Sequence, residues 1–378
     1  MSDVPMNDLR RIYDHHRNEI ETAVRGVLES GRYIAGSRTG AFAEAFASSL
    51  GVGHCLPVAN GTDALELALR AVTQEAADGE REGRSEVIGV ANAGGYASTA
   101  CLHVGLTPVF VDIDEASQLI SIEAAVAALT PRTLAVVATH LYGGLVDVAA
   151  LRAAIEATGY GHVAIIEDCA QAHGLSGPEG RAGAMGDLAA FSFYPTKNLG
   201  AFGDAGAVVT GSAALFDRLK RLHQYGWEPG SKYRIGLAGA RNSRMDELQG
   251  AILAALLPHL DDWNERRRAI VDRYQRAAPG DIRFVRSPIG HVAHLAVVLC
   301  ERRDALRDHL ARHGVATEIH YPTLDCDQPG WPHLAQADHA LPVSRRSLAR
   351  LLTLPCFPAM RDEEIDQVCG ALRAWSPS

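Results

Sequence analysis

Short apolar runs alternate with longer amphipathic segments from about residue 55 to residue 210. The runs are five or six residues long and rich in Val, Ile, Ala and Leu, which is typical of buried strands. Expected strands cover residues 55–59, 86–90, 108–112, 134–138, 162–167, 188–193 and 206–210. Expected helices between them cover residues 64–72, 122–129 and 148–158. This alternation predicts an α/β protein whose large, mixed, mostly parallel sheet is covered by helices on both faces.

The segments on either side of this region predict additional helices. Before it we expect one helix, a glycine-punctuated loop at residues 30–40 and a second helix at 41–50. After it, residues 243–277 predict one long helix, bent at Pro258 and bridging two domains. The charged run at residues 261–268 within that helix is expected to be a solvated face.

The remainder of the chain mixes short strands and helices. A strand is expected at residues 293–299, with helices at 304–313 and 363–375. This mixture is typical of a small α+β unit. We therefore expect a large domain with an N-terminal arm at residues 1–250, and a bridging helix with a smaller C-terminal α+β domain at residues 251–378.

Composition and charge exclude several classes of protein. The net charge of −9 over 378 residues argues against binding to nucleic acid, which requires a basic surface. The seven cysteines are scattered without a C-x-x-C pair, so neither a zinc site nor a disulfide framework is expected. We see no secretory signal and no run long enough to span a bilayer. A cytoplasmic protein without membrane partners is therefore expected.

One lysine stands out in the stretch FSFYPTKNLG, residues 191–200. An apolar strand and Pro195, which cannot continue the strand, place Lys197 on a tight loop at the strand end. A lysine in apolar surroundings has a lowered pKa and attacks carbonyl carbon, so Lys197 is a candidate for forming a Schiff base. The alternative is an ordinary solvated surface lysine.

Asp168 ends the strand expected at residues 162–167, and ligands of open α/β sheets bind at such strand ends. Its carboxylate either caps a following helix or pairs with a cation in the cleft. The pyridine nitrogen of pyridoxal phosphate is a cation that needs such a partner. Gln171, three residues on, would reach the phenolic oxygen of that ring, or it is a surface glutamine.

A phosphate site is indicated by the turn Asn-Gly-Thr-Asp at residues 60–63, between a strand and a helix. Gly61 permits close backbone approach, Thr62 adds a hydroxyl, and the first amides of the helix point outward. Ser192 would add another contact. The alternative is that Gly and Thr serve only as helix caps.

Motifs for other chemistries are missing from the sequence. There is no P-loop, no dinucleotide-binding G-x-G-x-x-G after the first strand, no H-E-x-x-H and no G-x-S-x-G. His15 and His16 are interpreted as a surface pair on a helix. No metal site is expected.

Taken together, six segments resemble one known family. NGTDALELALRA, PVFVDID, EDCAQAHG, FSFYPTKNLGAFGDAGAVVT, NSRMDELQGAIL and IHYP occur in the order found in the DegT/DnrJ/EryC1/StrS family. The resemblance covers residues 4–375. It implies PLP-dependent transferase fold type I, like aspartate aminotransferase, and a pyridoxal-phosphate aminotransferase that acts on nucleotide-linked keto-sugars.

The resemblance also implies roles for the cofactor residues. Lys197 is similar to the lysine that holds the cofactor as an internal aldimine. Asp168 is similar to the partner of the pyridine nitrogen, and Gln171 to a residue near the phenolic oxygen. The residues that match the phosphate site are Gly61, Thr62 and Ser192.

Further residues are assigned to the dimer and the substrate. Asn242 resembles a residue that contacts the phosphate held by the neighbouring subunit, which implies a homodimer with shared active sites. His320 and Tyr321 match a segment on the substrate side. Lys232 and Arg234 lie in a loop that could meet a diphosphate, or they are solvated loop charges.

The chain departs from the family at the position of the aromatic residue that stacks on the cofactor. Relatives commonly read P-A-N-T-Y-I-A-T where this chain has Ala-Asn-Ala-Gly-Gly-Tyr-Ala-Ser-Thr. Alignment from either flank puts Gly94 at the aromatic position. Tyr96 is therefore the expected replacement, unless the ring is left less covered.

The expected reaction moves an amino group from L-glutamate to a nucleotide-linked 3-keto or 4-keto deoxyhexose, giving an aminosugar and 2-oxoglutarate. Lys197 favours transamination over dehydration, because dehydratases of the family carry histidine at that position. The alternatives are amination of a cyclitol ketone, another PLP reaction, or a non-catalytic regulator. The nucleotide could be dTDP, UDP or GDP.

Overall fold

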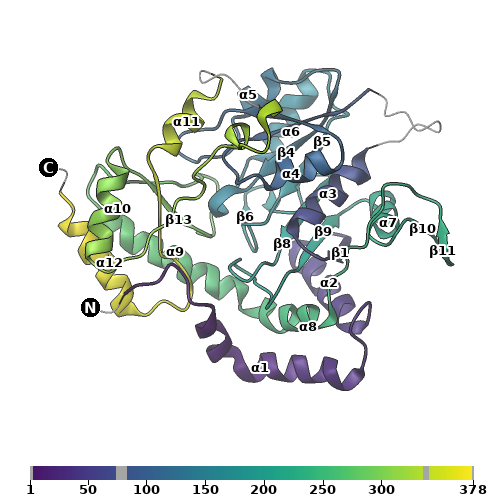
Figure 1. Cartoon of the computed structure of the whole chain (residues 1–378), viewed down its shortest axis with the longest axis horizontal. Helices are drawn as coiled ribbons and strands as arrows, with labels where there is room; N and C mark the ends of the chain where they lie inside the picture. Colours follow the sequence, from purple (N-terminus) through teal and green to yellow (C-terminus); the bar gives the residue numbers. More distant parts are fainter. Residues whose placement is uncertain (1–2, 74–82, 335–339, 377–378) are drawn as a thin grey trace.

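The computed structural model describes residues 3–73, 83–334 and 340–376, and its central element is a seven-stranded sheet (Figure 1). In sheet order the strands are β1 (His54–Val58), β9 (Gly206–Thr210), β8 (Leu188–Ser192), β5 (Ala164–Asp168), β4 (Thr133–Thr139), β2 (Glu86–Val90) and β3 (Thr107–Val111). Only β9 runs antiparallel to both of its neighbours, and every other pairing is parallel. The expected mixed, mostly parallel sheet is confirmed.

Alternation along the strands explains why helices cover both faces. In β8, Leu188 and Ala190 pack into one apolar cluster, whereas Ala189 and Phe191 pack into another. Because successive side chains point to opposite faces, a strand with apolar residues at every position needs cover on both. The helices on the first face are α3 (Gly61–Val72), α4 (Tyr96–His103) and α7 (Ala213–Leu222). Those on the second are α2 (Ser37–Leu50), α5 (Ile122–Ala127), α6 (Val148–Ala157) and α8 (Glu247–Leu256), and α1 (Leu9–Ser30) packs on the outside of α8.

Two of these helices, α4 and α7, were not expected from the sequence. The segment of α4 reads YASTACLH, and its small side chains show no strong apolar period. In α7 the side chain of Ser212 caps the helix by accepting a hydrogen bond from the Leu215 amide. Capping by serine is a recognisable signal that a helix begins.

A smaller antiparallel sheet is formed by the C-terminal part of the chain. It comprises β12 (Arg283–Phe284), β13 (Ala296–Leu299) and β14 (Leu351–Leu354). It packs with α10 (Arg303–Arg312), α12 (Asp362–Ala374) and part of α9 (Leu260–Ala277) around a separate apolar cluster. The N-terminal arm joins this cluster, since Val4 pairs with Val315. The division at residue 250 stays a prediction, and contact with Val315 places the start of the arm beside the smaller unit.

The remaining regular elements are short connections. They are η1 (Leu141–Gly143), β6 (Ser176–Gly177), β7 (Gly180–Arg181), β10 (Trp227–Glu228), β11 (Ser231–Ile235), η3 (Asp325–Asp327), η4 (Pro332–Leu334) and α11 (Pro342–Leu348). Among the described residues, no helix is both long enough and apolar enough to cross a membrane.

The expected long helix is present as two helices joined by a turn. The 3₁₀ turn η2 (Leu257–His259) contains Pro258 and separates α8 from α9, which confirms the bend. The prediction that residues 261–268 form a solvated face is wrong in part. Asn264 is 1% exposed and Arg267 is 3% exposed, because both lie on the helix face that also buries Ile270. This face points towards the candidate site described below.

Asn264 links α9 to two loops, which makes it a test of the packing. Its Nδ2 donates to the His173 carbonyl (2.8 Å), and its Oδ1 accepts from Asn198 Nδ2 (2.7 Å). We expect Asn264→Leu to lower the free energy of unfolding by about 1–3 kcal/mol, because buried partners lose their hydrogen bonds. Denaturant unfolding followed by circular dichroism measures this, with the exposed Glu265→Leu as the control. Equal stability of both variants would contradict the assignment.

Candidate active site

A cavity of about 620 Å³ lies where β5 and β8 end and α3 begins. Nine of the residues singled out in the sequence line it: Gly61, Thr62, Tyr96, Asp168, Gln171, Ser192, Lys197, His320 and Tyr321. They come from positions up to 260 residues apart. The parallel pairing of β5 with β8 places the two strand ends side by side, so Asp168 and the loop after Ser192 reach the same edge.

Lys197 is held by a tight turn that follows β8. Its backbone N–H donates to the Tyr194 carbonyl (2.8 Å), and Ala201 N–H donates to the Phe193 carbonyl (2.7 Å), which closes the loop. The side chain is half-buried, with protein on most sides and access to the cavity. Burial lowers the pKa of Lys197 to about 8, although the carboxylate of Asp168 opposes the shift. The expectation of a lysine with a lowered pKa is consistent with this environment.

Asp168 is buried at the end of β5 and has little compensation for its charge. Its Oδ1 accepts a hydrogen bond from Ala170 N–H (3.1 Å), and it forms no ion pair with a described residue. Burial raises the pKa of Asp168, against the influence of the Ala170 hydrogen bond and the charge of Lys197. No helix follows directly in the described chain, so the helix-capping alternative is wrong. The carboxylate is available to a cation in the cavity.

The neighbouring carboxylate, Glu167, holds the end of β5 in place. It bonds to His140 Nε2 (2.9 Å), and its other donors are the backbone amides of Gly183, Met185 and Gly186. Burial disfavours its charge, but these hydrogen bonds outweigh that effect and lower the pKa of Glu167. A fully satisfied anion here fixes the backbone from which Asp168 projects.

The start of α3 forms a cradle for an anion. Asn60 caps the helix through Oδ1, which accepts from Asp63 N–H (2.8 Å). The first amides of a helix have no partner within the helix and attract negative groups. A Cβ at Gly61 would lie 2.5 Å from the Cβ of Ser192, so only glycine permits this approach. Gly61, Thr62 and Ser192 therefore converge as expected.

A hydrogen-bonded network holds Gln171 and Tyr321 in the cavity wall. Gln171 Oε1 accepts from Tyr142 N–H (2.5 Å), and Gln171 Nε2 donates to Tyr321 Oη (2.9 Å). Tyr142 Oη donates to the His320 carbonyl (2.5 Å). This network fixes the amide of Gln171, which is not a free surface glutamine.

The glycine at the position where relatives carry an aromatic residue is constrained by its neighbours. Gly94 has φ +81°, and a Cβ there would lie 3.0 Å from the ring of Tyr321. An aromatic side chain at this position would collide with that ring. Tyr96 lines the cavity and meets Tyr321 edge-on, with ring centroids 6.1 Å apart. Stacking of Tyr96 on a cofactor stays a prediction.

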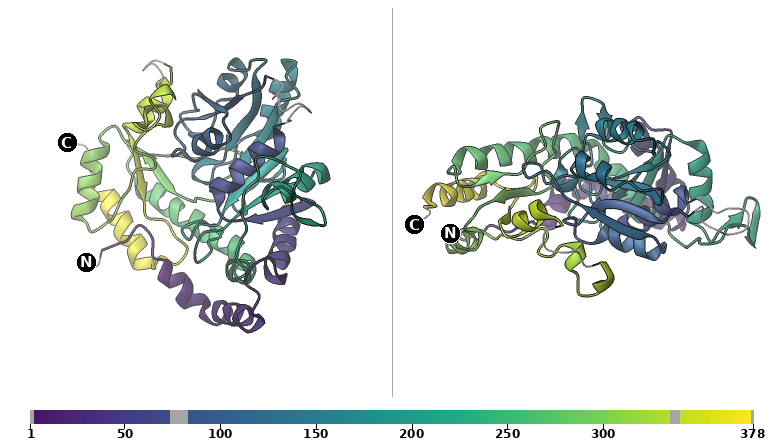
Figure 2. Two further views of the ribbon diagram at one scale, coloured as in Figure 1. Left: turned by 45° about the vertical axis from the view of Figure 1, so that its right-hand side comes forward. Right: turned by 90° about the horizontal axis from the view of Figure 1, so that it is seen from above.

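Three expected residues do not line this chain's cavity. Asn242 is exposed, and Lys232 and Arg234 lie on β11, in a hairpin that projects from the body (Figure 2). Arg234 pairs with Glu228 (2.9 Å). These three residues can therefore make their expected contacts only with a ligand or a subunit that lies outside this chain's own cavity.

Other cavity residues were missed by the sequence reasoning. Arg267 donates through Nη1 to the carbonyls of His294 (3.2 Å) and Cys356 (2.6 Å), and His294 is itself held by Asn198. Burial lowers the pKa of His294. The helical spacing of Asn264, Arg267 and Val271 was an available signal for an inward face. Met6, Asn7, Tyr194, Asp204 and Glu318 also line the cavity.

Comparison with known proteins gives matches over nearly the whole chain. The model of the DegT/DnrJ/EryC1/StrS aminotransferase family matches residues 14–373. The erythromycin biosynthesis sensory transduction protein EryC1 of Saccharopolyspora erythraea is 40% identical over 377 residues, covering 98% of this chain and 99% of that protein. The dTDP-3-amino-3,4,6-trideoxy-alpha-D-glucose transaminase of Streptomyces venezuelae is 38% identical, covering 99% and 96%. The crystal structure of S. venezuelae DesV in complex with a ketimine intermediate superimposes with a TM-score of 0.92 at 38% identity, covering 99% of both chains.

The lowered pKa of Lys197 can be measured directly, because the chain contains only three lysines, Lys197, Lys220 and Lys232. The protonated amine does not react with acylating reagents. In cofactor-free protein we expect modification of Lys197 to rise with pH and reach half its maximum near pH 8. Pulse acetylation with peptide mass spectrometry measures this, with exposed Lys232 correcting for the reagent. A midpoint near pH 10.4, the ordinary value for lysine, would contradict the structure.

Proposed function

The chain belongs to the DegT/DnrJ/EryC1/StrS aminotransferase family, and we propose that it uses pyridoxal phosphate to move an amino group from L-glutamate to a nucleotide-linked keto-deoxysugar. Membership shows that it is an aminotransferase, and the superposition on DesV confirms the expected fold type I. The observation that carries the proposal is that Lys197 and Asp168 face one cavity beside the start of α3.

The residues present fit pyridoxal phosphate in three respects. The Gly61–Ser192 cradle suits a phosphate, since a Cβ would fill it. Asp168 is a buried carboxylate without an ion-pair partner among the described residues, and it suits a protonated pyridine nitrogen. The amide of Gln171, which is held by hydrogen bonds, lines the same cavity. When bound, the cofactor would supply an electron sink for the charge that develops at the substrate carbon.

Lys197 supplies the nucleophile and the base. With a pKa of about 8, about a quarter of its amine is neutral at pH 7.5, whereas an ordinary lysine is almost entirely protonated. In our proposal the neutral amine takes the proton from the α-carbon of L-glutamate and later returns a proton to the sugar carbon that receives nitrogen. The tight turn at Tyr194 holds this amine in place.

Asp168 maintains the charge that the reaction requires. A carboxylate in this buried position favours a cationic neighbour strongly, because water screens it little. Glu167 and His140 hold the backbone of β5 without competing for the cavity, since their polar atoms bond to each other and to backbone amides. In this proposal Glu167, whose oxygens are bonded within the protein, holds the strand, whereas Asp168 faces the cavity and pairs with the cation.

The acceptor in our proposal is a dTDP-linked 3-keto deoxyhexose. Support comes from the transaminase of Streptomyces venezuelae, whose name specifies a dTDP sugar aminated at C3. The cavity of about 620 Å³ has the size of typical small-molecule sites. His320 and Tyr321 line the side that faces the smaller sheet and would contact the sugar.

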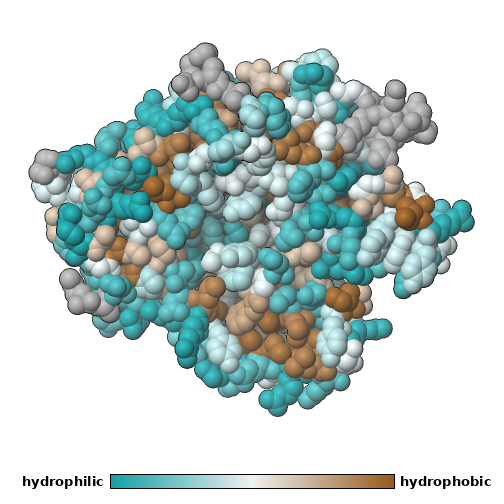
Figure 3. Space-filling model, in the orientation of Figure 1, coloured by the Kyte–Doolittle hydropathy of each residue, from teal (hydrophilic) through white to brown (hydrophobic). Residues whose placement is uncertain are grey.

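A homodimer would complete the site. Asn242, Lys232 and Arg234 do not line this chain's cavity, and large side chains are exposed on its surface, including Tyr194, Phe202 and Tyr233. Figure 3 shows apolar surface gathered over α1 and α8. Such surface is typical of an interface. We propose that a second copy covers it and brings the β10–β11 hairpin to its partner's substrate.

A regulatory role is the second candidate, because the relative from Saccharopolyspora erythraea is named a sensory transduction protein. Glutamate would leave the spectrum of a cofactor-free regulator unchanged, whereas it would bleach the visible absorbance of a transaminase. A panel of dTDP-3-keto, dTDP-4-keto and UDP-3-keto sugars and a cyclitol ketone then identifies the acceptor.

Lys197→Ala tests the catalytic assignment. We expect the turnover of L-glutamate and the keto-sugar to fall at least 1,000-fold, equivalent to about 4 kcal/mol, because nucleophile and base are lost together. Release of 2-oxoglutarate measures the reaction. Lys220→Ala is the matched control, since Lys220 is paired on the surface with Asp217. Lys197→Ala with wild-type turnover would refute the assignment.

Asp168→Asn tests both the effect of the buried carboxylate on stability and its effect on turnover. Because burial raises the pKa of Asp168, its ionised form destabilises the folded state, and this penalty grows as pH rises through the folded pKa. At pH 7.5 we expect the cofactor-free variant to melt at a higher temperature than wild type, while turnover falls about 100-fold or more. Exposed Asp261→Asn is the control. Lower thermal stability with unchanged turnover would contradict both roles.

A further inference from the structure

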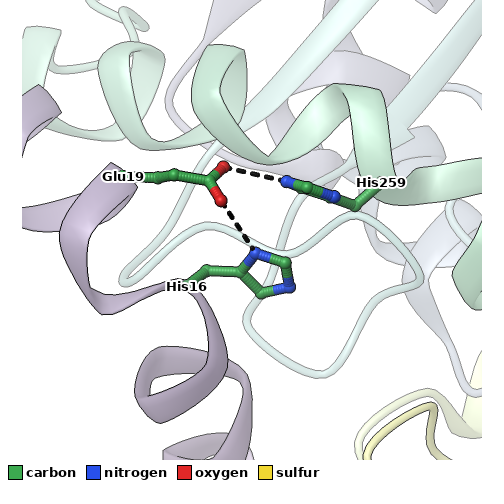
Figure 4. A group of neighbouring side chains, drawn as sticks. All are labelled: His16, Glu19 and His259. Atoms are coloured by element: carbon green, nitrogen blue, oxygen red, sulfur yellow. Dashed lines mark hydrogen bonds and ion pairs between the residues drawn. The ribbon is translucent and has the colours of Figure 1, made fainter.

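A second cluster of chemically active side chains lies outside the cavity, where α1 meets the turn between α8 and α9. His16 and Glu19 project from one face of α1, three residues apart, and His259 projects from η2 beside Pro258 (Figure 4). The two imidazole rings lie against each other, with centroids 4.2 Å apart, and the carboxylate of Glu19 bonds to one nitrogen of each ring. His259 follows Glu19 by 240 residues in the sequence.

The separations match those between ligands of one metal ion. Glu19 lies 3.4 Å from His16 Nδ1 and 2.8 Å from His259 Nε2, and one ligand atom from each residue falls within 4.8 Å of the others. Tetrahedral Zn²⁺ with bonds of about 2.0–2.2 Å holds its ligand atoms about 3.4 Å apart. Side-chain shifts of about 1 Å would therefore close the three groups around an ion.

The cluster is also open enough to receive an ion. The side chains of His16, Glu19 and His259 are 14%, 46% and 31% exposed, so water can supply the remaining coordination position. The buried group His140, Glu167 and Cys169 differs in this respect. There Val146 N–H donates to His140 Nδ1, and Glu167 accepts three backbone amides, which leaves few atoms for a metal.

We infer that His16, Glu19 and His259 bind one divalent transition-metal ion, of which Zn²⁺ is the best match, and thereby fasten α1 to the junction of α8 and α9. Two imidazoles and one carboxylate suit Zn²⁺ and disfavour Mg²⁺ and Ca²⁺, which take oxygen ligands. Of the pair expected to be a plain surface feature, His16 enters the cluster and His15 does not.

The position of this site gives the ion a structural consequence. Tyr13 on α1 and Trp263 on α9 line a second cavity of about 350 Å³, which also reaches Lys197. The Trp263 ring lies 5.3 Å from His16 and 5.8 Å from His259, measured between centroids. An ion between the histidines would fix both walls of this second cavity, and Trp263 provides an optical probe of binding.

Calorimetric titration of the tag-free holoenzyme with Zn²⁺ tests the inference. We expect one ion per chain, and at least tenfold weaker binding in His259→Ala and in Glu19→Gln, each of which removes one ligand. His15→Ala is the matched control and should bind like wild type. The seven cysteines are all buried, so thiols do not compete in the folded protein. Titration with Mg²⁺ should give the same heat for wild type and for Glu19→Gln, because Mg²⁺ is not expected to bind to this cluster.

Tryptophan fluorescence and thermal melting give independent readouts. Zn²⁺ should change the emission and raise the melting temperature of wild type and His15→Ala, and a chelator should reverse both effects. Circular dichroism checks that each variant is folded, and Glu19→Gln replaces His259→Ala if the latter is not. Zn²⁺ binding that is unchanged in both ligand variants, or absent from wild type at about 1 mM Zn²⁺, would overturn the inference.

Discussion

The proposed chemistry depends on two ionisable groups, Lys197 and Asp168, that line one cavity. Burial lowers the pKa of Lys197 to about 8 and raises that of Asp168, so the charged form of each group is disfavoured relative to water. Such opposed shifts are typical of functional sites, because a folded chain gains no stability from them alone. The seven-stranded sheet makes the arrangement possible by ending β5 and β8 at one edge.

The surrounding structure can be understood as support for these two groups. Glu167 and His140 fix the end of β5, the turn at Tyr194 fixes Lys197, and Asn264 ties α9 to the loop that carries Asn198. Gly61 leaves space at the start of α3 that a larger residue would fill. The polar atoms in this support are satisfied by protein, whereas the carboxylate of Asp168 and the amine of Lys197 remain open to the cavity.

Much of this arrangement follows from sequence because strands and strand-end loops carry local signals. Apolar runs predicted the strands of the large sheet, and the residues after them predicted Lys197, Asp168 and the Gly61 turn. Helix α4 was missed because its small residues have no clear period. Arg267 was predicted to be exposed because it is charged. Only tertiary packing shows that its guanidinium is buried and donates hydrogen bonds to two backbone carbonyls. The cluster of His16 and His259 joins distant segments and leaves no local signal.

The proposed shared active site and the proposed metal site both concern surfaces that one chain leaves exposed. The hairpin with Lys232 and Arg234 extends away from its own cavity, and α1 reaches from the N-terminal arm across α8. In these proposals a second subunit holds the hairpin, and a metal ion holds α1. If both proposals hold, the conformation of the site depends on contacts beyond the large sheet.

The most direct measurement is reductive fixation of pyridoxal phosphate followed by peptide mapping. Borohydride treatment of the holoprotein should attach one cofactor per chain to the peptide that contains Lys197, and none to those that contain Lys220 or Lys232. Attachment to either of the other lysines, or no attachment at all, would contradict the central claim that the amine of Lys197 holds the cofactor.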